Sequence, residues 1–188
     1  MALILAALVL SMLSPGDATM ARQGDQVDDP ACRFDPSSLD AGYREFDLDK
    51  PGNWRAIEKV KGCEPAAAEM LSQYRERYEQ LVPLMAWHEG QVRASIGQYP
   101  DAIELMRKSR RLAERDPAGW NLYVDATIAF LRKDRRKFQV ARRRLLALRK
   151  PPAWPAGASW PQNANVLRGL WKCFDRSYQT AYGDDCRR

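Results

Sequence analysis

The 188-residue chain has few of the groups on which most enzymes depend. It contains a single histidine, His88, and none of its four cysteines belongs to a C-x-x-C pair, so the common zinc sites lack ligands. A helical zinc protease needs a second histidine four residues later, where this chain has Val92. Gly-rich phosphate loops and the G-x-S-x-G nucleophile turn are also missing. The sequence therefore predicts no catalytic residues, no cofactor and no metal.

The N-terminal apolar run is too short to span a bilayer, which needs about 20 residues. Residues 2–13 are twelve residues with one polar member, Ser11, and Ser14-Pro15-Gly16 interrupts them. Small residues follow as far as Ala21, which is typical of a secretory signal, and no Lys or Arg precedes the run. We predict a signal peptide over residues 1–21 and no transmembrane segment in the mature chain. A buried N-terminal helix of an intracellular protein is the alternative.

The four cysteines all follow the predicted signal and form two groups along the chain. An even number in an exported chain indicates disulfides, and three connectivities are possible. We favour Cys32–Cys63 and Cys173–Cys186, because each closes a short segment and would contribute about 3–4 kcal/mol by loop closure. Free structural thiols and a metal site are the alternatives. Signal and disulfides together predict a periplasmic or secreted protein.

The positive charge of the chain is concentrated in one segment. The formal net charge is +6, and residues 132–150 hold ten Lys or Arg with one acid, Asp134, which makes this segment +9 and the remainder −3. Clustered arginine suits nucleic acid, but export argues against that partner. Anionic lipid or an acidic protein face is the better expectation, and a solvated helix face is the alternative.

Hydrophobic periodicity predicts an all-α fold. Hydrophobic residues are 45% of the chain, and six Trp supply bulk for a core. Residues 34–48 are expected to form short extended or turn pieces, and a short helix follows Asn53 and ends at Gly62. Longer helices are predicted over residues 64–81, 84–96, 100–114, 120–132, 135–148 and 163–174.

These elements indicate one domain after the signal. Residues 22–63 are expected to be a mobile stretch and an irregular N-terminal lid, residues 64–150 a core of antiparallel helical hairpins, and residues 151–188 a crossover loop, a last helix and a disulfide-closed tail. Helix 120–132 is apolar on most of its circumference and should therefore be central.

The segment from Trp87 to Ser109 resembles a tetratricopeptide (TPR) repeat. The resemblance lies in the pattern of small residues at the crossing of two helices and in the residues around the turn between them. The matching residues are Gly90, Gly97, Tyr99, Ala102, Ile103 and Ser109. Residues 120–145 resemble a second, degenerate unit, whose turn falls 37 residues after Gly97. The strings 87–91 and 119–131 are also similar to those of uncharacterised bacterial exported proteins. The TPR resemblance implies a concave groove that binds protein or peptide.

We therefore expect a non-catalytic binding module for a protein or peptide of the cell envelope, either an adaptor or an inhibitor, with immunity to a toxin as one concrete version. Residues 132–150 could also contact an anionic surface. The alternative function is a cell-wall hydrolase that uses Glu89 or another helix carboxylate. For the His88-Glu89 pair itself, the alternative to a contact with a ligand is a structural role between helices. The candidate partner-binding residues are Trp87, His88, Glu89, Arg93, Trp120, Tyr123, Arg135, Arg136, Arg142 and Arg143.

Overall fold

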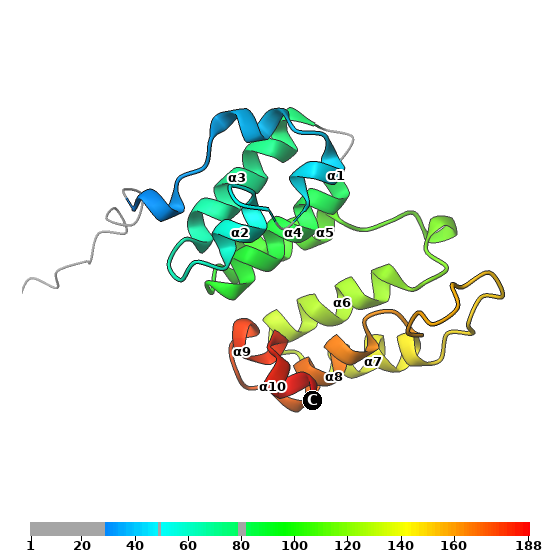
Figure 1. Cartoon of the computed structure of the whole chain (residues 1–188). Helices are drawn as coiled ribbons and strands as arrows, with labels where there is room; N and C mark the ends of the chain where they lie inside the picture. The colour runs from blue at the N-terminus through cyan, green and yellow to red at the C-terminus, as the bar shows by residue number, and fades with distance from the viewer. Residues whose placement is uncertain (1–28, 49, 79–81) are drawn as a thin grey trace, which may run out of the picture.

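A computed structural model describes residues 29–48, 50–78 and 82–188 (Figure 1). The predicted signal peptide, residues 1–21, lies outside the described residues, as does the start of the predicted lid. The described chain contains helices and no strand, which confirms the all-α class. It also contains the two expected disulfides, Cys32–Cys63 and Cys173–Cys186.

The described part of the N-terminal lid is a series of short helical turns. They are η1 (Pro30–Cys32), η2 (Pro36–Asp40), α1 (Tyr43–Phe46) and α2 (Trp54–Glu58). The carboxylates of Asp29 and Asp35 each accept the backbone N–H two residues later, and a proline directly follows each aspartate. This arrangement starts a helical turn, so the expected extended pieces are absent from the described residues and the expected turns are present.

Three helices follow and pack in sequence order. They are α3 (Glu64–Arg77), α4 (Val82–Ser95) and α5 (Tyr99–Lys108), with α4 against both of the others. Gly97 turns the chain between α4 and α5 with a positive φ of 82°. Gly90 permits the close approach of these helices, since a Cβ there would lie 3.1 Å from Met106 Cγ and 3.2 Å from the Ala102 carbonyl oxygen.

Helix α5 is shorter than predicted. It ends at Lys108 instead of residue 114, and only the short turn η4 (Ala113–Arg115) follows. Side chains of α6 form hydrogen bonds with the backbone groups that follow Lys108 and would otherwise have continued the helix. Trp120 Nε1 donates to the Ser109 carbonyl at 2.8 Å, and the Asn121 side chain bonds both the N–H and the carbonyl of Arg111. The connecting residues, including Ala113, are therefore mostly exposed.

The second half of the fold is built around α6 (Trp120–Leu131). Helix α7 (Arg135–Leu146) packs on it, and α8 (Ala164–Lys172) contacts both α6 and α7. The tail is more regular than expected, because it forms α9 (Tyr178–Tyr182) and α10 (Asp184–Arg187) over the Cys173–Cys186 disulfide. Gly169 of α8 lets α10 approach, since a Cβ there would lie 2.7 Å from Arg187 Cγ.

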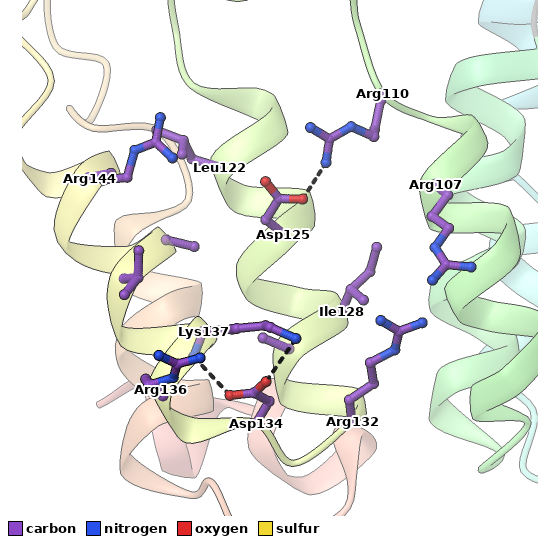
Figure 2. A pocket seen from close by; sticks show the side chains of 13 residues that line it. Arg107, Arg110, Leu122, Asp125, Ile128, Arg132, Asp134, Arg136, Lys137 and Arg144 are labelled. Carbon is purple, nitrogen blue, oxygen red and sulfur yellow. Dashed lines mark hydrogen bonds and ion pairs between the residues drawn. The ribbon is translucent and has the colours of Figure 1, made fainter.

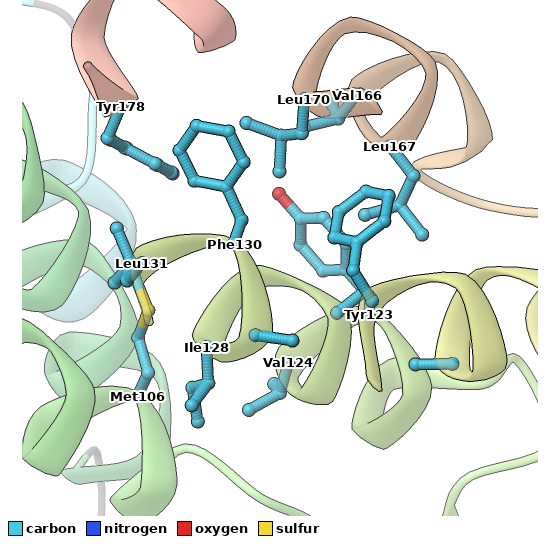
Figure 3. Close-up of a cluster of buried hydrophobic side chains, with 14 of the residues drawn as sticks. Met106, Tyr123, Val124, Ile128, Phe130, Leu131, Val166, Leu167, Leu170 and Tyr178 are labelled. Carbon is cyan, nitrogen blue, oxygen red and sulfur yellow. The ribbon is translucent and has the colours of Figure 1, made fainter. Parts of the chain in front are cut away.

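The core consists of two apolar clusters, of which the first joins the two halves. The first surrounds α6 and takes side chains from α4, α5, α7, α8 and α9; Figure 3 shows Phe130 and Tyr123 of α6 beside Leu170 and Tyr178. The second lies under the N-terminal segment, where Phe46 stacks on Tyr74 at 3.6 Å. Helix α4 contributes to both, with Trp87 in the first cluster and Met85 in the second. Helix α6 is thus the central helix that its sequence predicts.

Candidate functional site

The three predicted partner-binding aromatics pack in the core or against it: Trp87 and Tyr123 are buried, and Trp120 is partly buried. Trp87 and Tyr123 are 3% and 2% exposed, and Trp120 packs edge-on against Trp87 at 4.8 Å. The Trp120 indole N–H is also used by the Ser109 carbonyl. The prediction that these rings face a partner is therefore corrected, because they form the apolar junction between α4 and α6.

Glu89 is buried and held by two arginines. Its carboxylate accepts from Arg75 Nε at 3.1 Å and from Arg93 Nε at 2.8 Å, while the Glu89 side chain is only 2% exposed. Arg93 continues the network to the Gln98 side chain at 2.9 Å. Both carboxylate oxygens are thus engaged in tying α3, α4 and the following turn together, and Glu89 does not face either of the two pockets described below.

His88 lies in a separate polar contact beneath the N-terminal segment. Its Nε2 is 3.6 Å from Asp47 Oδ1, and Arg55 bonds the same Asp47 oxygen at 2.8 Å. Trp54 packs on the imidazole at 5.1 Å between ring centroids. Burial lowers the pKa of His88, and the negative charge of Asp47 opposes that shift. This environment fits a structural histidine that joins α4 to the lid.

A cationic hollow lies where α5, α6 and α7 meet. We call it the basic groove; its volume is about 740 Å³. Figure 2 shows arginines reaching toward it from the end of α5 and from α7. Six cationic and two acidic side chains line it, with an apolar floor between them. These residues are Arg107, Arg110, Leu122, Asp125, Ile128, Ala129, Arg132, Asp134, Arg136, Lys137, Val140, Ala141 and Arg144.

Ion pairs neutralise both acids of the basic groove. Asp125 pairs with Arg110, and Asp134 pairs with Lys137 at 3.3 Å (Figure 2). Among the described residues, by contrast, no carboxylate forms an ion pair with Arg132, Arg136 or Arg144, which are the other groove-lining arginines of the α6–α7 segment, although Asp134 acts on Arg136 from a greater distance. The groove therefore presents uncompensated positive charge beside apolar surface, of which Val140 is 44% exposed.

Only Arg136 among the four predicted α7 arginines lines the basic groove. Arg135 instead pairs with Asp175 at 2.6 Å and covers the Phe174 ring at 4.6 Å. Lys133, from the same basic segment, donates to the carbonyls of Phe174 and Arg176. Arg142 and Arg143 do not line the basic groove. Part of the basic segment thus fastens the C-terminal tail, and is not available to a partner.

Sequence reasoning missed the contribution of α5 and α6 to the basic groove. Arg107 and Arg110 lie more than 20 residues before the basic segment, and Asp125 belongs to a helix that was recognised only for its apolar character. The positions of these three side chains relative to one another depend on the angle at which α5 and α6 pack. No local pattern in the sequence encodes that packing angle.

A second hollow, the polar cleft, lies between α2, α4 and the C-terminal helices α9 and α10. Its volume is about 570 Å³. Three carboxylates, Glu58, Glu64 and Asp184, line it together with aromatic and basic side chains. Burial raises the pKa of Glu58, the positive charge of Arg55 opposes this, and the negative charge of Glu64 adds to it. The sequence analysis assigned no role to this group of residues.

Comparison with protein-family models, curated proteins and solved structures finds no match to this chain. No helix among residues 29–48, 50–78 and 82–188 has the length and apolar character needed to cross a membrane. Within the same residues, no group of three or more His, Cys, Asp or Glu side chains is placed to hold a metal ion.

Proposed function

We propose that this chain is a non-catalytic binding module that holds a protein or peptide in the basic groove. The observation that carries the proposal is the combination of an apolar floor with three arginines, Arg132, Arg136 and Arg144, that form no ion pair with a carboxylate among the described residues. Arginine clusters bind acidic motifs through charge-assisted hydrogen bonds, and exposed apolar side chains such as Val140 add contact area.

The chemistry of the groove favours an acidic, partly apolar partner. A segment with several Asp or Glu residues would meet the excess of four positive charges in the lining, and one or two apolar side chains would cover the floor. The signal-like N-terminus and two disulfides support a periplasmic or secreted location. An adaptor or an inhibitor, including an immunity protein against an envelope toxin, would work in this way.

We also propose that α4–α5 and α6–α7 are two TPR-like hairpins. The short turn at Gly97 and the close contact at Gly90 support this for the first pair. The Asp134 side chain, which accepts the Lys137 N–H at 2.9 Å after the Lys133 turn, supports it for the second. The basic groove would then be the concave junction between consecutive hairpins.

Capture from envelope extract with the disulfide-bonded protein, followed by calorimetry on each purified candidate, tests the binding proposal. The key variant is Arg132→Glu/Arg144→Glu, which reverses two groove charges. The matched control is Arg143→Glu/Arg149→Glu, which changes the net charge equally with two exposed arginines that do not line the groove. We expect the groove variant to lose at least about tenfold in affinity and the control to lose little.

Equal loss in both variants would show attraction by overall charge and would reject the groove as the site. Recovery of no partner, together with release of cell-wall fragments by the protein, would reject binding as the function. Binding to anionic vesicles that is equally weakened in the two variants would indicate a general membrane contact through residues 132–150.

A cell-wall hydrolase is the second candidate, because Glu58 and Glu64 share the polar cleft and the pKa of Glu58 is raised. It ranks second for two reasons. First, Glu64 Oε2 is already engaged, because it accepts the Gly62 N–H at 2.8 Å. Second, Arg55 and His88 cover the Trp54 ring, so this ring offers no open face for a sugar. Release of soluble muropeptides, abolished by Glu58→Gln with the fold intact, would reverse this order.

A further inference from the structure

One continuous stretch of the chain, residues 135–174, contains ten Lys or Arg and no acidic residue. It comprises α7, α8 and the crossover loop that joins them. Its middle part, residues 151–167, carries no charged side chain, whereas Arg149 and Lys150 come directly before it and Arg168 directly after it. The stretch therefore consists of an uncharged segment that is bordered by positive charge on both sides.

The crossover loop is closed at its base and exposed at its tip. Trp160 Nε1 donates to the Leu148 carbonyl at 3.1 Å, which brings the end of the loop back to the end of α7. Trp154 packs edge-on against Trp160 at 4.8 Å between ring centroids. Both rings are partly exposed, and residues 155–159 are all exposed. Figure 1 shows the loop at the end of the molecule away from α9 and α10. It thus presents a compact, uncharged and partly aromatic tip.

Helix α7 adds an exposed stripe that ends beside this loop. Gln139, Arg143 and Leu146 recur at i, i+4 and i+7 and therefore lie on one side of the helix. All three are exposed, Leu146 with 44% of its surface, and none of them lines the basic groove. Among the described residues, no carboxylate forms an ion pair with Arg143, Arg149 or Lys150. The end of α7 and the loop thus combine exposed apolar surface with unpaired positive charge.

An anionic bilayer matches this combination better than a folded macromolecule does. Basic residues are attracted to anionic headgroups, and the tryptophan ring favours the headgroup level of a membrane. The exposed side chains at the loop tip are small (Pro, Ala and Ser), so a folded protein would find few contacts there that depend on shape. Nucleic acid would satisfy the positive charge but would offer no apolar phase to Leu146. A fluid bilayer meets both needs, since it requires no fixed complementary shape.

We propose that the end of α7 and the crossover loop form a docking surface for an anionic lipid bilayer. Trp154, Trp160 and Leu146 lie at the level of the lipid headgroups in this arrangement, and Arg149 and Lys150 contact the lipid phosphates. The contact is peripheral, because no helix in the described part of the chain can cross a membrane. It depends neither on the basic groove nor on the protein partner proposed for that groove.

Flotation of the disulfide-bonded protein with lipid vesicles tests the proposal. One set of vesicles contains phosphatidylglycerol and phosphatidylcholine in equal parts, and the other contains phosphatidylcholine alone. We expect the protein to bind the anionic vesicles at low salt and to bind the neutral vesicles at least about tenfold more weakly. Added salt should weaken the binding to anionic vesicles, because it screens exposed charges.

A pair of charge-reversal variants ties the binding to this surface. The loop variant, Arg149→Glu/Lys150→Glu, reverses the two charges that precede the uncharged segment. The lid control, Arg44→Glu/Lys61→Glu, changes the net charge equally in the N-terminal lid, and all four side chains are exposed. We expect the loop variant to lose at least about tenfold in affinity for the anionic vesicles and the lid control to lose less than about threefold.

Fluorescence quenching by lipids brominated near the top of their acyl chains locates the contact on the loop. The tryptophan variant, Trp154→Phe/Trp160→Phe, keeps two aromatic rings in the loop, and four Trp remain elsewhere in the chain. At vesicle concentrations that bind both proteins fully, brominated lipid should quench the original protein. Most of this quenching should disappear in the tryptophan variant, because the loop indoles are the ones that lie at the headgroup level.

Failure to float with anionic vesicles at low salt would overturn the proposal, as would an equal loss in the loop variant and the lid control. Unchanged quenching in the tryptophan variant would show that another part of the protein meets the bilayer. Tighter binding to poly-L-glutamate or to duplex DNA than to the vesicles, lost in the loop variant, would assign the surface to an acidic protein or to nucleic acid instead. The groove variant, Arg132→Glu/Arg144→Glu, should bind vesicles like the lid control, so failure here is distinguishable from failure of the proposed protein-binding function.

Discussion

Replacing Glu89 by glutamine should lower the free energy of unfolding by about 3 kcal/mol. The carboxylate is 2% exposed and accepts from Nε of both Arg75 and Arg93. Glutamine retains the shape but has only one oxygen, so its amide N–H₂ would face one guanidinium N–H with no acceptor between them. Removing one member of a buried ion pair costs about 3–5 kcal/mol. We expect the lower end, because the arginine side chains are 17% and 22% exposed and partly reach water.

Urea unfolding at pH 7, followed by circular dichroism with the disulfides intact, measures this change. For a domain of this size, about 3 kcal/mol corresponds to a fall in Tm of about 6–12 °C. The control is Glu69→Gln, an exposed α3 carboxylate that accepts from the Gln73 side chain at 2.9 Å, and it should change stability by less than about 0.5 kcal/mol.

A Glu89→Gln variant as stable as the original protein would refute the structural role inferred from its burial. If that variant also lost a cell-wall hydrolytic activity, Glu89 would return as a catalytic candidate. A double-mutant cycle with Arg93→Met would then separate the pairwise energy from the effect of each replacement alone.

Three further predictions concern the lid, the helix crossing and the disulfides. Because burial lowers the pKa of His88, proton NMR of this single histidine should give a midpoint below 6.5. The stability that neutral His88 contributes is present above pH 6.5 and is lost as the pH falls through the folded-state pKa. The variant His88→Gln should therefore show a weaker dependence of unfolding free energy on pH in this range. An NMR midpoint above 6.5 would contradict the lowered pKa. Gly90→Val should cost about 1–3 kcal/mol in urea unfolding because the new side chain meets α5, and a neutral result would mean that the helices are not in such close contact. Paired Cys→Ala replacement should cost about 4 kcal/mol for Cys32–Cys63, whose residues are 31 apart, and about 3 kcal/mol for Cys173–Cys186, 13 apart; the reverse order would show that loop entropy is not the main contribution.

The helices were largely predictable because their signals are local. Stripes such as Phe138, Ala141 and Leu145 repeat at helical spacing and are all buried as expected. The predicted ends were less accurate. Helix α5 stops at Lys108 because the indole of Trp120 and the side chain of Asn121, from the next helix, take over the following backbone groups.

The candidate sites were predictable only in part. The basic segment was visible as a run of charge, but the sequence does not distinguish Arg136, which lines the basic groove, from Arg135, which is bound to Asp175. Likewise, the His88-Glu89 pair looked like one polar site. Adjacent residues on a helix point about 100° apart, and these two therefore enter different networks.

The sequence by itself determined the helical class and the central position of α6, and it favoured the cysteine pairing that the structure contains. Each follows from the spacing of residues within a helix or from proximity along the chain. Only the tertiary structure decided which charges are neutralised and where hollows form. These depend on contacts such as that between Gln91 and Tyr182, 91 residues apart, whose geometry is set by the packing angles of several helices at once.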